Sequence, residues 1–427
     1  MDPSNSPTRT ATLFTPGFVL LCFATLMFYV SYQVLIPTLP PYVLQMGGGE
    51  YHVGLVMSAF PLASVLMRPF AGQWIDAGYK KVLLVCGALV YLSASILYMV
   101  TPFLNGLVAV RFLHGLGMGL YSTAASSLTA DSAPPSRRGE ALGYFMLATS
   151  MAMAIGPALG VYVTDHLSYV ALFALSAALS LGALLCALPV KQPGRAGGPR
   201  VGDADGSDAA SGHAIRQSLS SRLKCLVGLE AMFPSVVIFL GSATWGSIAS
   251  FLALFAESRG IHNSGVFFSA FAVAMFATRL FAGRISDRLG RAHVIIPSFV
   301  AVCIGMLLLA AAKSVREVVV SAVFYGMGFS TMQPMITAFT VDHVAPHRRG
   351  AAIGTLLAMY DMGTALGGIL AGRIAAIASI DAVFWPMAGV AACGLLVFVA
   401  GHKRYSARNA CGQPGGGTES GKVTEAV

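Results

Sequence analysis

Long apolar runs follow one another along almost the whole chain, and each is bounded by charged residues, glycine or proline. Most of them are about 20 residues or longer, which is the length that an α-helix needs to cross the hydrocarbon core of a bilayer. A segment in lipid must satisfy its own backbone hydrogen bonds, so we expect each run to be helical. The pattern predicts twelve spans, at residues 17–42, 53–75, 81–101, 104–129, 140–163, 167–189, 230–256, 263–286, 292–312, 316–340, 350–376 and 381–401.

The second half of the chain repeats the first. The segment from Arg68 to Asp76 returns as Arg279 to Asp287, a shift of 211 positions, and the same shift carries Asp131 onto Asp342. In each copy the repeated segment lies where an apolar run ends and a charged turn begins. Tandem halves of this kind are typical of one large class of secondary transporters. The sequence therefore predicts an all-α integral membrane protein, with twelve transmembrane helices in two duplicated six-helix bundles.

Composition excludes a soluble protein. Apolar residues make up 56% of the chain and charged residues 11%, whereas roughly a quarter of the residues in a soluble domain are charged. The net charge of +9 does not indicate a nucleic-acid partner, because the basic residues fall in short loops beside the spans. The seven cysteines are scattered singly, so we expect neither a disulfide framework nor a metal site.

The basic residues also predict the orientation. With both termini in the cytoplasm, that side holds nearly all Lys and Arg of the loops, and only Arg259, Lys313 and Arg316 fall on the opposite side. The positive-inside rule favours this topology. The expected organisation is a cytoplasmic tail at 1–16, a six-helix bundle at 17–190, a cytoplasmic linker at 191–229, a second six-helix bundle at 230–402 and a cytoplasmic tail at 403–427.

One charged turn of the second half carries a known signature. It reads Gly283-Arg-Ile-Ser-Asp287-Arg288-Leu-Gly290-Arg291. This run resembles the cytoplasmic signature of the major facilitator superfamily, and within it that of the twelve-span, proton-linked multidrug exporters. The first half departs from the signature, because Gly72 and Asp76 are in place but Ala77 stands where Arg is expected.

The residues of this signature can form a conformational latch, that is, a contact that stabilises one packing of the two halves and is broken in the other. An Asp in such a turn can face the positive N-terminus of another helix, which is worth about 0.3–2 kcal/mol depending on burial. A contact made in only one packing of the two halves is the differential interaction that a two-state transporter needs. The alternative is that Asp76 and Asp287 only cap their own turns. The expected latch residues are Gly72, Asp76, Asp131, Gly283, Asp287, Arg288, Gly290, Arg291 and Asp342.

A second signature lies in the fourth span, where Arg111-Phe-Leu-His114 is followed by a ladder of glycines. This is similar to another motif of the same family, and an ionisable residue inside a span is a functional hypothesis by default. Arg111 is expected to modulate a proton site, the alternative being that it binds backbone carbonyl groups. His114 can change its charge near neutral pH, so it is either a proton carrier or a packing residue.

A third signature lies in the fifth span, from Ala152 to Gly160. It resembles the motif that marks antiporters in the family, with Ala152 in place of its first glycine. Proline removes one helical hydrogen bond and bends the axis, and the flanking glycines allow close packing. The alternative is an ordinary helix kink. The expected kink residues are Gly156, Pro157 and Gly160.

The strongest single residue is Asp361, which lies about eleven residues into an uninterrupted apolar run. At about 1.5 Å per residue this places it near the middle of the bilayer. Desolvation there favours the neutral carboxyl group and a nearby Arg favours the ionised one, so the side chain can take up and release a proton as its exposure changes. A buried structural hydrogen bond and direct binding of a cation are the alternatives. We expect Asp361 to carry the coupled proton.

The substrate cavity is expected to be uncharged elsewhere. Many multidrug exporters of this family carry an acid in the first span, but here that span offers only neutral groups such as Tyr32 and Gln33. The seventh span adds Trp245, Ser250 and Phe251. A cavity lined by aromatic and hydrogen-bonding groups suits a small amphipathic molecule, and the missing acid argues against a cationic drug.

These features predict a transporter and not an enzyme, since neither an H-E-x-x-H nor a G-x-S-x-G motif is present. The resemblance implies a proton-coupled exporter of a small amphipathic drug, sugar or metabolite, working by alternating access in the inner membrane. A proton-coupled importer and a non-transporting membrane sensor are the alternatives. The expected partners are a small-molecule substrate, protons and the lipid bilayer; we expect no nucleic acid, no cofactor and a monomer.

The orientation can be tested at the linker. A cysteine introduced by Ser207→Cys should lie in the cytoplasm, so an impermeant thiol reagent added to intact cells should label it no more than the parent protein. Labelling should appear once the cells are opened. Strong labelling in intact cells would reverse the predicted topology.

Overall fold

The structure is a computed structural model that describes residues 14–134, 137–190, 192, 231–261, 265–344 and 349–410. Its elements are α1 (Pro16–Gln33), α2 (Leu39–Gln45), α3 (Glu50–Asp76), α4 (Lys80–Val100), α5 (Leu104–Asp131), α6 (Arg138–His166), α7 (Tyr169–Ala187), α9 (Met232–Ser258), α10 (Gly265–Leu289), α11 (Ala292–Ala311), α12 (Val315–His343), α13 (Arg349–Ile377), the 3₁₀ turn η5 (Ile380–Ala382) and α14 (Phe384–Ala410). Every regular element of the described residues is helical, as predicted.

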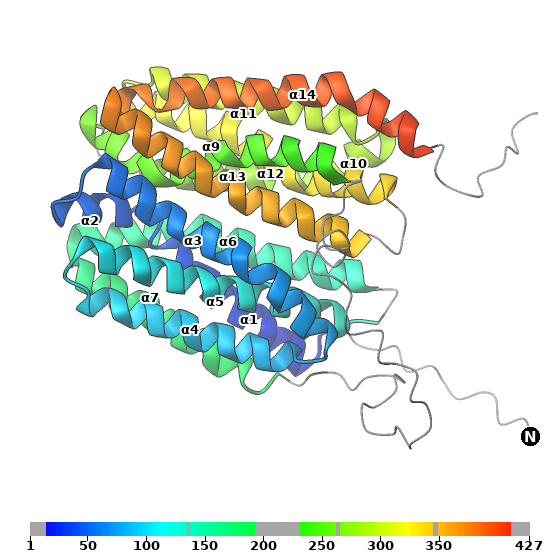
Figure 1. The fold of residues 1–427 in the computed structure, drawn as a ribbon, viewed down its shortest axis with the longest axis horizontal. Coiled ribbons are helices and arrows are strands. Elements are labelled where there is room, and N and C mark those ends of the chain that lie inside the picture. Colours follow the sequence, from blue (N-terminus) through cyan, green and yellow to red (C-terminus); the bar gives the residue numbers. More distant parts are fainter. Residues whose placement is uncertain are drawn as a thin grey trace, which may run out of the picture.

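The two halves form two bundles that lie side by side, α1–α7 in blue to green and α9–α14 in green to red (Figure 1). Within the first bundle α3 and α4 pack on α5, and α1 packs on α6 and α7. The second bundle repeats this arrangement, with α10 and α11 on α12 and α9 on α13 and α14. The two bundles meet along α3 with α13 and α6 with α10, which are again equivalent pairs. The repeat in the sequence is therefore a repeat of packing.

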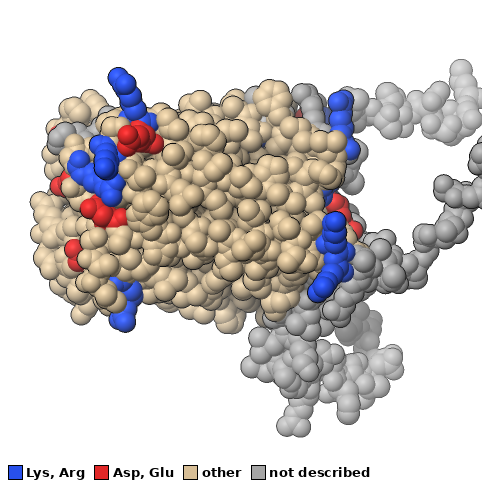
Figure 2. Space-filling view, turned by 90° about the horizontal axis from the view of Figure 1, so that it is seen from above, with Lys and Arg blue, Asp and Glu red and all other residues tan. Residues whose placement is uncertain are grey.

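The outer surface is that of a membrane protein. In Figure 2 the charged side chains gather at the two ends of the bundle, and the face between them is uncharged. Nine of the described helices are long and apolar enough to cross a membrane by length and composition. The long helices α5, α10 and α12 are not among the nine, and α5 carries the buried Arg111 that lowers its apolar character.

The first predicted span is wrong in one respect, because it is not one continuous helix. α1 ends at Gln33 and α2 begins at Leu39. Pro37 has no N–H group to donate, and the chain before it closes tighter turns, with Leu35 N–H donating to Tyr32 O at 3.1 Å. Prolines also stand at positions 40 and 41. The last helix differs as well, since α14 continues to Ala410 beyond the predicted end of the second bundle.

The described chain starts and finishes at one end of the molecule, which we call the tail end; the opposite end is the far end (Figure 1). At the far end the two halves touch closely through α3 and α13. A Cβ atom added at Gly54 would lie 2.7 Å from the carbonyl oxygen of Gly368 and 3.1 Å from Cα of Gly372. One turn further along α3, Ser58 Oγ donates to Ala365 O at 2.6 Å. No side chain fits between the helices here, so this contact closes the far end.

This close contact predicts the effect of a larger side chain. Gly54→Leu should force α3 and α13 apart and shift the molecule towards a state open at the far end, because the native packing has no room for it. The check is the distance distribution between spin labels at Tyr51 and Ile377, both exposed at the far end. Gly389→Leu is the matched control, since a Cβ there meets open space. An unchanged distribution for Gly54→Leu would show that this contact does not close the molecule.

Candidate functional site

A cavity of about 370 Å³ lies between the two bundles. Its lining comes from the middle and the tail-end half of the surrounding helices, while the α3 and α13 contact closes the far end. The lining residues are Tyr29, Tyr32, Gln33, Phe60, Pro61, Ser64, Arg68, Met118, Ser122, Thr123, Ser126, Phe145, Met146, Thr149, Ser150, Met153, Trp245, Met275, Arg279, Phe329, Ser330, Gln333, Leu357, Tyr360, Asp361 and Thr364.

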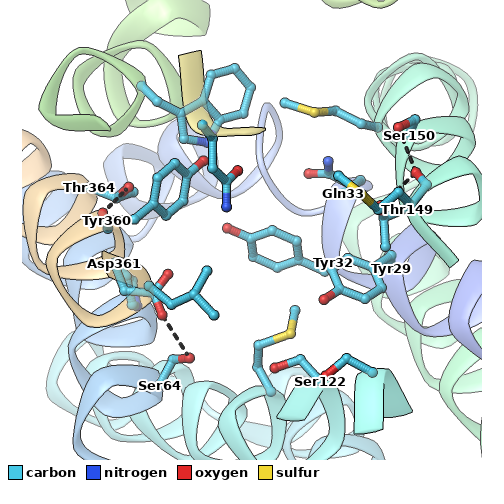
Figure 3. A pocket seen from close by; sticks show the side chains of 18 of the residues that line it. Tyr29, Tyr32, Gln33, Ser64, Ser122, Thr149, Ser150, Tyr360, Asp361 and Thr364 are labelled. Carbon is cyan, nitrogen blue, oxygen red and sulfur yellow. Dashed lines mark hydrogen bonds between the residues drawn. The ribbon is translucent and has the colours of Figure 1, made fainter. Parts of the chain in front are cut away.

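Asp361 lines this cavity and makes an ion pair between the halves. Arg68 Nε on α3 donates to Asp361 Oδ2 on α13 at 2.7 Å, and Ser64 Oγ donates to the same oxygen at 3.3 Å. Ser64 and Arg68 are four residues apart, so they share one face of α3. Figure 3 shows Asp361 directed from α13 towards Ser64. Both hydrogen bonds go to Oδ2, and Oδ1 has no hydrogen-bond partner among the described residues.

Arg68 was not predicted as the partner of Asp361. In the sequence Arg68 stands out only as part of the repeated segment, and the basic group of the proton site was predicted to be Arg111. The signal was present, because Arg68 stands eight residues before the end of its helix and recurs as Arg279. Arg279 lines the same cavity from α10. It donates to Ser150 Oγ on α6, and its Nε approaches Ser330 O at 3.4 Å.

Arg111 and His114 lie behind the cavity wall. Arg111 is completely buried, with its guanidinium carbon 4.7 Å from the ring centre of Phe60 and 5.5 Å from that of Tyr32. Within the described residues, its Nε and Nη1 atoms have no hydrogen-bond partner. His114 is equally buried, and its Nδ1 lies 3.2 Å from the hydroxyl group of Tyr98. Tyr32 and Phe60 therefore separate this pair from the cavity.

Three of the predicted latch residues, Asp131, Arg291 and Asp342, form equivalent ion pairs in the two halves. Lys80 is paired with Asp131, and Arg291 Nε is paired with Asp342 Oδ2 at 2.9 Å. These residues are equivalent under the shift of 211 positions, and each pair joins neighbouring helices of its own half. The side chains of Asp76 and Asp287 and the surroundings of Gly283 lie outside the described part of the structure.

The glycines that follow α3 and α10 occupy slightly different positions in the two copies of the repeat. Gly78 and Gly290 both have a positive φ, 96° and 93°. Each follows the end of its helix, in the left-handed conformation that glycine adopts without strain. Gly78 stands one position earlier in the repeat than Gly290, and α3 also ends early, because its last residue, Asp76, is equivalent to Asp287 whereas α10 continues to Leu289. Gly72 lies within α3 with open space around its Cβ position, and Arg288 is exposed near the end of α10.

The glycines of the fifth span pack on the broken first span. A Cβ atom added at Gly156 would lie 2.4 Å from Cβ of Gln33, and one at Gly160 would lie 2.2 Å from Val34 O. Pro157 lies inside α6 between them. The motif thus holds α6 against the point where α1 ends, beside the cavity residue Gln33.

Three of the five predicted cavity residues line the cavity, namely Tyr32, Gln33 and Trp245. Ser250 and Phe251 do not, because Ser250 Oγ donates to Gly246 O of its own helix at 2.8 Å and Phe251 is completely buried. Tyr32 points into the middle of the cavity and Thr149 and Ser150 approach from α6 (Figure 3). The cavity holds hydroxyl groups, aromatic rings and methionines in addition to its three charged side chains.

Comparison with known proteins identifies the family. The model of the Major Facilitator Superfamily matches residues 21–267 and 235–413. The chain belongs to the major facilitator superfamily. It is therefore a multi-pass membrane transporter of a small molecule and not an enzyme.

Relatives of this superfamily match over almost the whole chain. The uncharacterized MFS-type transporter YhhS of Escherichia coli strain K12 is 26% identical, over 89% of this chain and 90% of its own. The staphylopine export protein of Staphylococcus aureus is 24% identical, over 90% and 94%. Among solved structures, the nucleoside transporter NupG matches with a TM-score of 0.69 at 18% identity, over 90% of this chain and 99% of that one. The human organic anion transporter MFSD10 matches with a TM-score of 0.63 at 17% identity, over 90% and 98%.

The pair across the halves of this transporter predicts a non-additive loss of stability. Arg68→Gln and Asp361→Asn should each lower the unfolding midpoint, because each leaves a partly buried charge without its partner, at a cost of about 1.5–3 kcal/mol. The double variant should lose clearly less than the sum of the two. Thermal unfolding in detergent measures all three.

The more exposed pair of Arg259 and Asp381 at the far end is the matched control. Its single variants should cost less, since exposed pairs contribute only about 0.2–1 kcal/mol. Strict additivity for Arg68 and Asp361 would show that the two side chains do not interact.

Proposed function

We propose that this major facilitator transporter is a proton-coupled exporter of a small amphipathic molecule, with Asp361 as the proton carrier. The observation that supports the coupling is the ion pair of Asp361 and Arg68, which bridges α13 and α3. It joins the two bodies that must move relative to each other in alternating access, and it depends on the charge of one carboxylate. Protonation of Asp361 removes half of the pair and so weakens the observed packing.

The arrangement of oxygen atoms favours exchange of proton and substrate. Oδ2 of Asp361 accepts from Arg68 and Ser64, while Oδ1 accepts no hydrogen bond within the part of the chain that the structure describes. A proton and a hydrogen-bond donor of the substrate therefore compete for the same carboxylate. Competition for one group is the requirement of an antiporter, because the carrier then crosses with one or the other.

Three observations support export as the direction of transport. The fifth span carries the antiporter-like motif, and its glycines pack against the first span beside the cavity. One of the relatives is named an export protein. We take the tail end as cytoplasmic from the distribution of basic residues, so the cavity described here reaches towards the cytoplasm, where an exporter collects its substrate. The same distribution favours both termini in the cytoplasm, and we propose that the protein works as a monomer in the inner membrane.

The other predicted sites have supporting roles in this proposal. Arg111 is a fixed positive charge behind Tyr32 and Phe60, and His114 lies beside it. Their burial separates them from the cavity, so we assign the moving proton to Asp361 and a modulating charge to Arg111. The ion pairs of Asp131 and Asp342 stiffen each half as a body that moves as a unit.

Coupling can be tested without a known substrate. Lowering the pH should shift the wild-type protein away from the observed state, in which the far end is closed. The reason is that protonated Asp361 no longer forms an ion pair with Arg68. Asp361→Asn should show the shifted population at every pH and lose the response. The measurement is the distance distribution between spin labels at Tyr79, in the turn between α3 and α4, and Leu289, the last residue of α10, both exposed at the tail end.

Asp381→Asn, which changes an exposed far-end carboxylate, should keep the full pH response. A pH response that survives in Asp361→Asn would place the proton on another residue, and His114 would be tested next. Direction is tested separately, by comparing metabolites in the medium of cells with wild-type protein, with Asp361→Asn and without the gene. A compound that is enriched inside the cells with wild-type protein would support import instead.

A further inference from the structure

Two hollows meet at Arg279. The central cavity is joined by a groove of about 380 Å³ between α6, α10 and α12. The two share Met146, Ser150, Arg279 and Ser330 as lining residues. A molecule that reaches Arg279 from the central cavity is therefore also next to the groove.

The central cavity carries more positive than negative charge. Its lining contains three charged side chains, Arg68, Arg279 and Asp361. Arg68 is paired with Asp361. Within the described residues, Arg279 contacts only neutral oxygen atoms, the hydroxyl group of Ser150 and the carbonyl group of Ser330. An uncompensated cation in a low-dielectric site is unfavourable, and an anion that reaches it is held strongly.

The guanidinium group of Arg279 is available to a ligand. It has five N–H donors, and the two contacts to Ser150 and Ser330 occupy two of them. Arg111 differs, because its unpaired nitrogen atoms are sealed from the cavity by aromatic rings. Arg279 lines both hollows, so its remaining donors face space that a ligand can fill. Its fork of donors matches the two oxygen atoms of an acid group.

The groove beyond Arg279 is apolar. Leu147, Phe276, Pro334 and Met335 line it together with the shared Met146. Leu147 and Phe276 are 39% and 53% exposed on the outer surface of the bundle, where lipid is expected. The groove thus gives a hydrocarbon or aromatic group an apolar place beside a positive charge.

We propose that the substrate is an amphipathic organic acid, whose acid group binds Arg279 and whose apolar part lies in the groove between α6, α10 and α12. This deepens the proposed export function and rests on it for the transport step. Asp361 then takes a hydrogen-bond donor of the same molecule, and Arg279 supplies the charge selectivity. Arg68 and Arg279 are equivalent in the repeat but have different partners in this proposal. Arg68 binds the proton carrier, and Arg279 binds the substrate.

The acid site is tested by equilibrium binding to the purified protein in nanodiscs at fixed pH. The probes are radiolabelled N-acetyl-, N-benzoyl- and N-decanoylglycine with their methyl esters, and empty nanodiscs correct for uptake by lipid. At least one acid should bind the wild type about tenfold or more tightly than its ester, because a charge-assisted pair is lost in the ester. Arg279→Gln should remove this preference, and Arg279→Lys should restore part of it.

The groove is tested with glycines of α6. A Cβ atom at Gly143, which lines the groove, meets nothing within 4 Å, so Gly143→Phe places a ring in the groove without a clash at its base. It should weaken binding of N-decanoylglycine and leave N-acetylglycine unchanged. Gly139→Phe is the matched control, because Gly139 has the same open surroundings one turn away and does not line the groove.

Equal binding of acids and esters by the wild type, no detectable binding of any acid up to millimolar concentration, or unaltered acid binding by Arg279→Gln would each overturn the proposal. Unaltered binding of N-decanoylglycine by Gly143→Phe would remove the groove from it. Arg316→Gln, an exposed arginine at the far end, should behave as the wild type. These measurements use no proton gradient, so their failure is separate from a failure of proton coupling at Asp361.

Discussion

The ion pair between Arg68 and Asp361 is the interaction on which the rest of the arrangement depends. In the interior of a membrane protein an isolated carboxylate or guanidinium group is expensive, and each is tolerated here because the other is 2.7 Å away. The two groups belong to different halves, so the free energy that holds the halves together at this point depends on the charge of one carboxylate. A contact of this kind is strong while both charges persist and is lost as a whole when one is neutralised.

The duplication supplies a symmetric scaffold, and function lies where the symmetry fails. Equivalent helices pack in equivalent ways in both halves, and the pairs of Lys80 with Asp131 and Arg291 with Asp342 are copies of one another. The arginines at positions 68 and 279 are also copies, yet only Arg68 faces an acid. Symmetric pairs stabilise two rigid bodies. The acid at position 361 has no equivalent in the other half, so the two sides of the cavity differ in charge. A substrate with two chemically different ends can bind such a cavity in one orientation.

The sequence predicted the helices well because length and apolar character are local properties. It predicted the position of Asp361 within a span for the same reason, since the depth of a residue can be counted along one helix. It did not predict that Arg68 is the partner, because that contact joins α3 to α13 and depends on how two bundles dock. Ser250 and Phe251 were misplaced for a related reason: a helix that is apolar on all sides does not show which face lines a cavity. The break after Gln33 had a local signal, Pro37, that the length of the apolar run concealed.

Two contacts between α3 and α13 respond to different influences. At the far end, Gly54 and Gly368 bring α3 and α13 together through backbone packing that no proton can alter. Along the same two helices, nearer the tail end, Arg68 and Asp361 make a contact that a proton can remove. Both contacts join α3 to α13. Weakening the ion pair therefore changes how strongly these two helices hold together directly, without a third helix having to move. The same pair of helices therefore closes the far end of the cavity and also carries the contact that depends on the charge of Asp361.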